Sequence, residues 1–201
     1  MSEKHDLRVI RTKKLIKDAF LELISQKGFT SITVQDIAGT ATIGRGTFYL
    51  HYKDKYDLLD QLTDQALAKL SELIQPSFHL RDNKLNLEEL KQMLIHVFDA
   101  IRSEKTFFKT MLSSHDTPNF TQQLTQFFFN KFTAEYENLN LSQKKEVPKG
   151  ILISYLSSAI LGVIIWWLQN DMMYASEYMA EQITNLLING PASIFDVEYE
   201  I

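Results

Sequence analysis

The chain has 201 residues, of which 45% are hydrophobic and 23% are charged, and it contains no Cys. This composition is typical of a globular protein and excludes a disulfide scaffold, a thiolate metal site and a Cys nucleophile. The net charge of −4 is unevenly spread, because residues 1–60 carry +2 and residues 61–201 carry −6. The N-terminus is too polar for a signal peptide, so we expect a cytoplasmic protein.

Apolar residues recur with a helical period from the start of the chain. Residues 15–24 form one apolar face of a first helix, and Gly28 follows as its expected C-terminal stop. Thr33, with Asp36 three residues later, resembles a capping box and predicts the start of a short helix. A second short helix is predicted from Arg45 to Leu50, after a break of about four residues.

The later segments repeat this pattern. A long helix is predicted from about Asp54 to Pro76, and further helices over about 86–101, 106–113, 119–137, 148–170 and 176–189. No alternating strand pattern of useful length appears. The predicted fold class is therefore all-α, with about nine helices.

Residues 150–168 contain no charged side chain, and this uncharged segment is long enough to span a bilayer. A membrane-anchored helical protein is therefore one alternative. Small and semi-polar residues (Ser154, Ser157, Ser158 and Gly162) recur along the segment, and the centre of a helical bundle or a subunit interface has the same composition. We favour a soluble protein with no membrane partner.

Residues 33–52 have the layout of a helix-turn-helix, in which the second helix enters the DNA major groove. The expected exposed residues of that helix are Arg45, Gly46, Thr47 and Tyr49, which could contact phosphates and base edges, while Phe48 would face inward.

At these residues the chain resembles the TetR family of transcriptional regulators. The resemblance covers about residues 9–70 and rests on Thr33, Asp36-Ile37-Ala38, Gly46-Thr47-Phe48-Tyr49, His51, Tyr52, Lys55 and Asp57-Leu58-Leu59. It implies an N-terminal three-helix DNA-binding domain (9–70) joined by a long helix to a C-terminal effector-binding and dimerisation domain (71–201). The chain departs from the family at Thr42, where the turn usually has Gly.

The resemblance also implies the DNA contacts. Arg45, Gly46 and Thr47 would face the bases, with Gly44 at the preceding cap position, and Thr33, Tyr49, His51 and Lys55 would contact phosphates. Lys55 would lie in the first turn of the following helix, so that its ammonium and the free N–H groups of that turn point at DNA.

The C-terminal part is rich in Phe and Met. These residues could line an apolar effector pocket or could form an ordinary core; the candidates are Met93, Phe98, Phe107, Phe108, Met111 and Phe128. Isolated His residues give no metal-ligand spacing, and no catalytic constellation is recognisable, so we expect no metal, no cofactor and no enzymatic activity.

The segment from Leu161 onward is similar to a TetR subgroup that includes the dihydroxyacetone-kinase operon regulator. This resemblance implies a four-helix dimer interface made by the last two helices, with Ile160, Ile164, Trp167, Met179, Ile183 and Leu187 as candidate residues.

The expected partners are a pseudo-palindromic DNA operator, a second copy of the chain and an unidentified small-molecule or protein effector. The favoured function is a homodimeric repressor; the main alternative is a co-activator whose C-terminal domain binds a protein.

Overall fold

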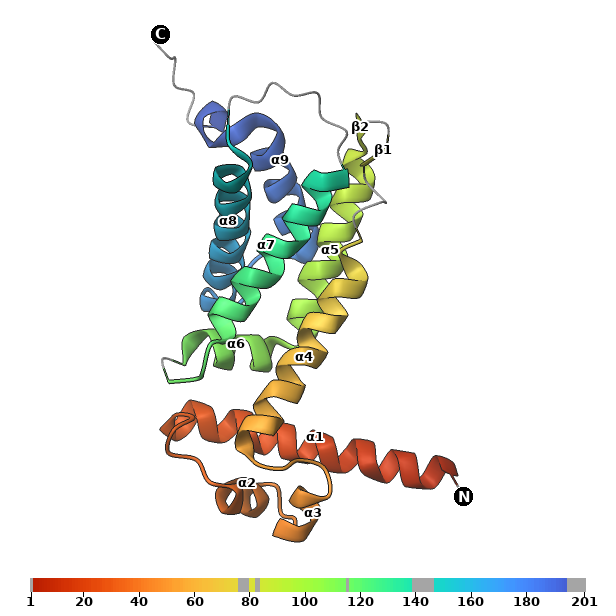
Figure 1. The fold of residues 1–201 in the computed structure, drawn as a ribbon, viewed down its shortest axis with the longest axis vertical. Coiled ribbons are helices and arrows are strands. Elements are labelled where there is room, and N and C mark those ends of the chain that lie inside the picture. Colours follow the sequence, from red (N-terminus) through yellow and green to blue (C-terminus); the bar gives the residue numbers. More distant parts are fainter. Residues whose placement is uncertain (1, 76–79, 82–83, 115, 139–146, 195–201) are drawn as a thin grey trace. The chain divides into compact units, whose positions relative to one another are not determined.

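The computed structural model describes residues 2–75, 80–81, 84–114, 116–138 and 147–194. Within them lie nine helices and one short hairpin, which confirms the all-α prediction (Figure 1). The helices are α1 (Ser2–Lys27), α2 (Val34–Thr40), α3 (Arg45–Tyr49), α4 (Lys55–Leu73), α5 (Leu87–Ser103), α6 (Lys105–Ser113), α7 (Phe120–Asn138), α8 (Lys149–Gln169) and α9 (Ser176–Ile194). The hairpin, which the sequence did not predict, pairs β1 (Leu80–Arg81) with β2 (Lys84–Leu85).

The chain divides into two compact units. The first comprises Met1–Ala68 and Thr106–Thr121, and the second comprises Lys69–Lys105 and Gln122–Ile201. The first unit therefore takes in α6 and the start of α7 in addition to α1, α2, α3 and most of α4. The predicted division into domains at residues 9–70 and 71–201 stays a prediction; in the compact units, residues 106–121 group with the N-terminal helices.

The core of the first unit is aromatic. Phe20, Phe29 and Phe48 are almost completely buried, and the Phe29 ring meets the edges of Phe20 and Tyr56 at centroid distances of 6.1 and 5.2 Å. Such edge-to-face pairs stabilise a core beyond the apolar area that they bury. The first helices are thus held on a continuous apolar centre, as the helical period of residues 15–24 predicted.

In the first unit, α6 adds a second aromatic cluster. Phe107 packs on both Phe108 and Phe120 at a centroid distance of 5.4 Å, and the ammonium of Lys17 on α1 lies 5.7 Å from the centre of the Phe107 ring. This contact links α6 to α1 within the first unit.

In the second unit, α5 packs along α9. Phe98 on α5 also meets Trp167 on α8 edge to face at 5.1 Å. The Trp167 indole N–H and the Arg102 guanidinium both donate to the carbonyl oxygen of Tyr174, at 3.0 and 2.8 Å. These contacts hold α5 and α8 to the turn that precedes α9.

Among the described residues, α8 is the one helix long and apolar enough to cross a membrane by length and composition. About 33% of its most apolar window is buried inside the protein. The core helix of a soluble bundle passes the same test, so α8 by itself is weak evidence for a membrane span.

Candidate nucleic-acid interface

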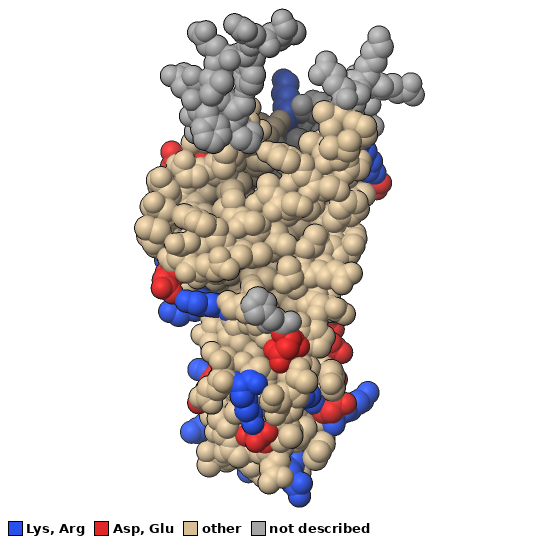
Figure 2. Space-filling model, turned by 90° about the vertical axis from the view of Figure 1, so that its left-hand side faces the viewer, with Lys and Arg blue, Asp and Glu red and all other residues tan. Residues whose placement is uncertain are grey.

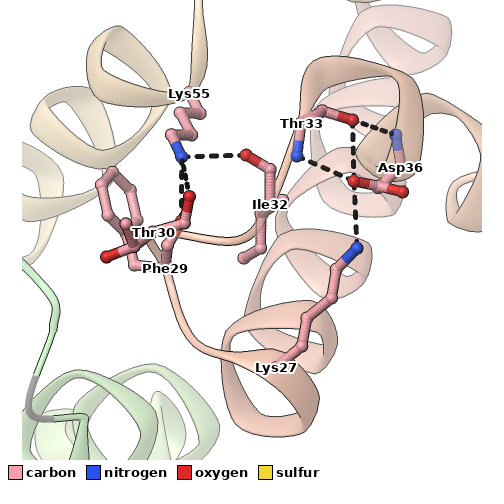
Figure 3. Close-up of polar contacts among 7 residues, drawn as sticks. All are labelled: Lys27, Phe29, Thr30, Ile32, Thr33, Asp36 and Lys55. Carbon is pink, nitrogen blue, oxygen red and sulfur yellow. Dashed lines mark hydrogen bonds and ion pairs between the residues drawn. The ribbon is translucent and has the colours of Figure 1, made fainter.

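The start of α2 is fixed by a complete capping box (Figure 3). The Asp36 amide donates to the Thr33 hydroxyl at 3.2 Å, and the Thr33 amide donates to the Asp36 carboxylate at 2.8 Å. The Lys27 ammonium lies 3.0 Å from the same carboxylate. The Thr33 hydrogen bond and the bond from Lys27 lower the pKa of Asp36 to about 2, so at neutral pH α2 begins at a charged cap tied to the end of α1.

The turn between α2 and α3 uses an unfavourable residue. Thr42 has a φ of +55°, in the left-handed region that glycine prefers. Its amide donates to Gly39 O at 3.1 Å, and the Ile43 amide donates to Ala38 O at 2.9 Å. This pair of bonds is a Schellman ending. Thr42 thus occupies the position where the resemblance led us to expect Gly, and its side chain has a steric cost there.

The short helix α3 is anchored by one side chain. Phe48 is completely buried and packs against Tyr49 and Tyr52, each at a centroid distance of 5.7 Å. Around the rest of α3, Arg45 and Gly46 are exposed, and Tyr49 is 56% exposed. Thr47 is partly exposed. All four residues that the sequence predicted to be exposed on α3 therefore reach solvent.

The two remaining predicted contacts near α3 differ in their surroundings. Gly44 takes the N-cap position of α3, where it makes no side-chain hydrogen bond. His51 is partly buried just after α3, and this burial, with the nearby Lys13 charge, lowers the pKa of its imidazole. A neutral imidazole still has one N–H to donate to a phosphate.

Lys55 requires a correction. The sequence predicted that its ammonium points at DNA, whereas the structure turns it toward the loop between α1 and α2 (Figure 3). The ammonium donates to the carbonyl oxygens of Phe29 (3.0 Å), Thr30 (3.0 Å) and Ile32 (2.9 Å). An ammonium has three donors, so these bonds use all of them. Lys55 also lies 4.7 Å from the centre of the Phe29 ring.

Two of the first N–H groups of α4 are likewise occupied. Asp54 accepts from the amides of Tyr56 and Asp57 at 2.8 and 2.9 Å. Just before α4, Asp57 accepts from the Lys53 amide at 2.7 Å. Side chains of the protein therefore cap part of this turn, and a contact of its other N–H groups with DNA stays a prediction.

The six candidate pocket residues are divided between the two units. Phe107, Phe108 and Met111 are buried in the first unit, and Phe98 and Phe128 are buried in the second, where Met93 is partly exposed. Each buried Phe belongs to a packed core, as its ring contacts with Phe120, Trp167 or Phe127 show. An effector pocket among them stays a prediction.

The predicted dimer residues lie on the wrong side of their helices. Ile160, Ile164, Trp167, Met179 and Ile183 are buried within their own chain, and of the six only Leu187 is exposed. The exposed face of α8 is a different stripe, which carries no charge: Ile151, Ser154, Tyr155, Ser158, Ala159, Gly162, Trp166 and Gln169. Because α8 is apolar on all sides, its sequence period could not distinguish the two faces.

No group of three or more His, Asp and Glu side chains that could hold a metal ion occurs in the part of the chain that the structure describes.

An exposed short helix, anchored by a buried ring and preceded by a capped helix and a tight turn, defines a helix-turn-helix DNA-binding protein. Residues 16–62 match the family described as bacterial regulatory proteins, tetR family, and residues 88–189 match the transcriptional regulator C-terminal region. The chain belongs to the TetR family of DNA-binding transcriptional regulators, which are not enzymes.

Curated relatives agree with this assignment. Two uncharacterised HTH-type regulators of Bacillus subtilis, YxbF and YerO, are 24% and 30% identical over 186 and 139 residues, which are 90% and 69% of this chain. The chain spans only 46% and 45% of their lengths. The fatty acid metabolism regulator protein of B. subtilis is 22% identical over 185 residues, covering 87% of this chain and 93% of that protein.

Solved structures share the fold. The dihydroxyacetone kinase operon activator DhaS matches with a TM-score of 0.57 and 22% identity, over 94% of this chain and 98% of that one. A TetR regulator from Streptococcus agalactiae matches with a TM-score of 0.62 and 23% identity, over 93% and 99%. FadR from B. subtilis in complex with stearoyl-CoA matches with a TM-score of 0.58 and 18% identity, over 88% and 98%.

Proposed function

We propose that this protein is a cytoplasmic, homodimeric repressor that binds a pseudo-palindromic DNA operator and leaves it when an effector binds. The observation that carries the proposal is the anchored α3 helix, which exposes Arg45, Gly46 and Tyr49 over the buried Phe48. A dimer presents two such helices to successive turns of the major groove, and the operator therefore has two related half-sites.

Within each half-site the side chains would divide their roles. The Arg45 guanidinium and the Thr47 hydroxyl suit base edges, and the absence of side chains at Gly44 and Gly46 permits close approach of the backbone to DNA. Tyr49 and His51 carry hydrogen-bond donors suited to phosphate oxygens. The Thr33 hydroxyl already donates to the Asp36 carboxylate, so Thr33 would have to exchange that bond to reach a phosphate. Lys55 would act indirectly, because its ammonium is committed to three carbonyl groups of the protein.

The dimer would form through the exposed faces of α8 and α9. No Lys, Arg, Asp or Glu occurs between residues 150 and 169, and Figure 2 shows a broad uncharged area on the side of the second unit where α8 lies. Ile151, Tyr155 and Trp166 on α8 are 62%, 53% and 45% exposed. Aromatic residues and a lack of charge characterise the core of subunit interfaces, so a second copy of this face is the fitting occupant.

The effector would be a metabolite with an apolar part. Support comes from the apolar side chains buried in the second unit and from the likeness to the B. subtilis fatty acid regulator and to the stearoyl-CoA complex of FadR. Release of DNA requires that the ligand bind the DNA-free conformation more tightly than the DNA-bound one.

One experiment tests these elements together. Duplexes with a random central segment are selected with the purified protein, and the mass of the complex with the enriched duplex is measured. The proposal predicts a two-fold symmetric motif bound by two protomers. Addition of stearoyl-CoA as the probe should release the duplex if long-chain acyl groups are recognised. A motif without symmetry would exclude the dimeric mode, and a failure to enrich any motif would exclude sequence-specific binding.

A second candidate is an activator that responds to a protein partner. Trp166, Tyr174 and Tyr178 form a stacked, partly exposed aromatic row at the turn between α8 and α9, with centroid distances of 6.2 and 4.7 Å. Exposed aromatic side chains suit protein interfaces, and the structural neighbour DhaS is an activator by its description. Co-purification of a protein, together with indifference to acyl-CoA, would favour this candidate.

A further inference from the structure

Asp116, in the turn between α6 and α7, contacts the loop that joins α1 to α2. Its carboxylate accepts from the Thr30 amide at 2.9 Å and from the Ser114 hydroxyl at 2.7 Å. These two bonds, of which the Thr30 bond is the stronger influence, hold the pKa of Asp116 well below its usual range. Asp116 and Thr30 are 86 positions apart in sequence but belong to the same compact unit.

Lys55 acts on the other side of the same peptide group. The N–H that Asp116 accepts belongs to Thr30, and the carbonyl to which Lys55 donates at 3.0 Å belongs to Phe29, so both atoms are part of the peptide bond between Phe29 and Thr30. One peptide dipole therefore lies between a carboxylate at its positive end and an ammonium at its negative end. Hydrogen bonds in such a chain polarise and strengthen one another.

Gly28 makes room for this arrangement. It has a φ of +77°, and a Cβ added there would lie 2.6 Å from the Asp116 carboxylate oxygen Oδ2. The close approach of Asp116 to the loop therefore requires glycine for two reasons, the left-handed backbone and the space.

The loop leads directly to the DNA-binding helices. Thr33, three residues after Thr30, is the N-cap of α2, and α2 contacts α3. Residues 106–121 are joined covalently at both ends to residues of the second unit, namely Lys105 and Gln122. A displacement of this segment can therefore reach the α1–α2 loop through the hydrogen bond of Asp116.

We propose, on the basis of the DNA-binding function proposed above, that Asp116 is a positioning residue for α2 and α3. Its hydrogen bond to Thr30, reinforced by Lys55 across the shared peptide group, holds the α1–α2 loop in the arrangement that lets α3 fit a half-site. The α6–α7 turn is thereby part of the DNA-binding machinery, although it never touches DNA.

The proposal can be tested by whether DNA affinity rises or falls when the negative charge of Asp116 is removed. Removal of an acidic group ordinarily raises affinity for DNA or leaves it unchanged, because the phosphates are negative. The proposal predicts instead that Asp116→Ala binds the selected operator about tenfold more weakly, since the hydrogen bond to a charged acceptor is worth about that factor. Asp116→Asn, which removes the same charge but keeps an acceptor, should lose less. Asp60→Asn, on the exposed side of α4, removes one negative charge and serves as the matched control.

Three outcomes would overturn the proposal. They are operator affinity of Asp116→Ala equal to or above that of the control, equal affinities of the Ala and Asn variants, and equal losses on operator and random duplexes. The last outcome would indicate general destabilisation, because a positioning role lowers the ratio of operator to random affinity.

Amide hydrogen exchange separates this proposal from the proposed function. Protection of the Thr30 amide and of the first amides of α2 should fall in Asp116→Ala and remain in Asp60→Asn. If the wild-type protein selects no DNA sequence, the proposed function fails while this measurement still decides whether Asp116 holds the loop. Unchanged protection at Thr30 and α2 would overturn the positioning role of Asp116.

Discussion

The Thr33 hydroxyl donates to the Asp36 carboxylate at 2.7 Å while it accepts from the Asp36 amide at 3.2 Å, so the two residues cap α2 reciprocally. The same carboxylate binds the Lys27 ammonium at 3.0 Å. One side chain thus joins the end of α1 to the start of the helix-turn-helix. The orientation of α2 therefore depends on the charge of Asp36.

This dependence predicts a pH effect. The pKa of Asp36 is lowered to about 2 in the folded protein, below its ordinary value of 3.8. The stabilisation is therefore present above the unfolded pKa and is lost as the pH falls through the folded one. Urea unfolding should show that Asp36→Asn is less stable than the wild type at about pH 6 and that the difference shrinks toward about pH 2. A difference that stays constant over this range would contradict the role of the charge.

Lys55 should contribute to stability instead of to phosphate binding. Lys55→Met keeps an unbranched apolar stem but leaves three carbonyl groups without their donor, which should lower the free energy of unfolding by about 1–3 kcal/mol. The slope of DNA affinity against salt concentration should not change, because no phosphate contact is removed.

Lys53→Met, in the exposed turn before α4, is the matched control for stability and should cost little. A shallower salt slope for Lys55→Met, with unchanged unfolding, would restore Lys55 as a phosphate contact.

Thr42 predicts a stabilising substitution. Its left-handed backbone crowds a β-branched side chain, whereas glycine adopts this conformation freely. Thr42→Gly should raise the free energy of unfolding by about 0.5–1 kcal/mol, after the greater flexibility of glycine in the unfolded chain is subtracted. Thermal unfolding measures this change, and a lower melting temperature would show that the Thr42 side chain makes a compensating contribution.

A charge introduced on the exposed face of α8 should change the oligomeric state of the protein. Ala159→Glu places a charge in the middle of the uncharged stripe, and an unpaired charge buried in an interface should weaken dimerisation about a hundredfold. Sedimentation velocity would then detect monomers at concentrations where the wild type is dimeric. Gln123→Glu, on the exposed surface of α7, adds the same charge and should leave the dimer intact. If both variants are dimers, the exposed face of α8 is not the dimer interface.

Local signals in the sequence predicted the parts of the site that depend on neighbouring residues. Thr33 and Asp36 lie three positions apart and Gly28 ends a regular apolar period, so the cap of α2 and the end of α1 could be anticipated. Phe48 was expected to face inward because the exposed residues of α3 are polar or small. The structure confirms these placements.

Contacts between distant residues could not be predicted in this way. Lys55 meets carbonyl groups 23 to 26 positions earlier, and Asp116 meets Thr30 across 86 positions. The family resemblance suggested a phosphate contact for Lys55. It could not show the competing carbonyl groups, because it carries no information about the α1–α2 loop. On α8, apolar residues on every side concealed which stripe packs against the rest of the chain, so Ile160 and Ile164 were assigned to the wrong face.

If α3 reads DNA sequence, the protein must bind the selected duplex more tightly than a scrambled duplex at the same salt concentration. We expect the ratio of the two affinities to be about a thousand or more for the wild type. Arg45→Ala and Thr47→Ala should each lower this ratio about tenfold or more while they reduce binding to the scrambled duplex much less. A wild-type ratio near one, or a ratio unchanged in both variants, would show that α3 does not read DNA sequence.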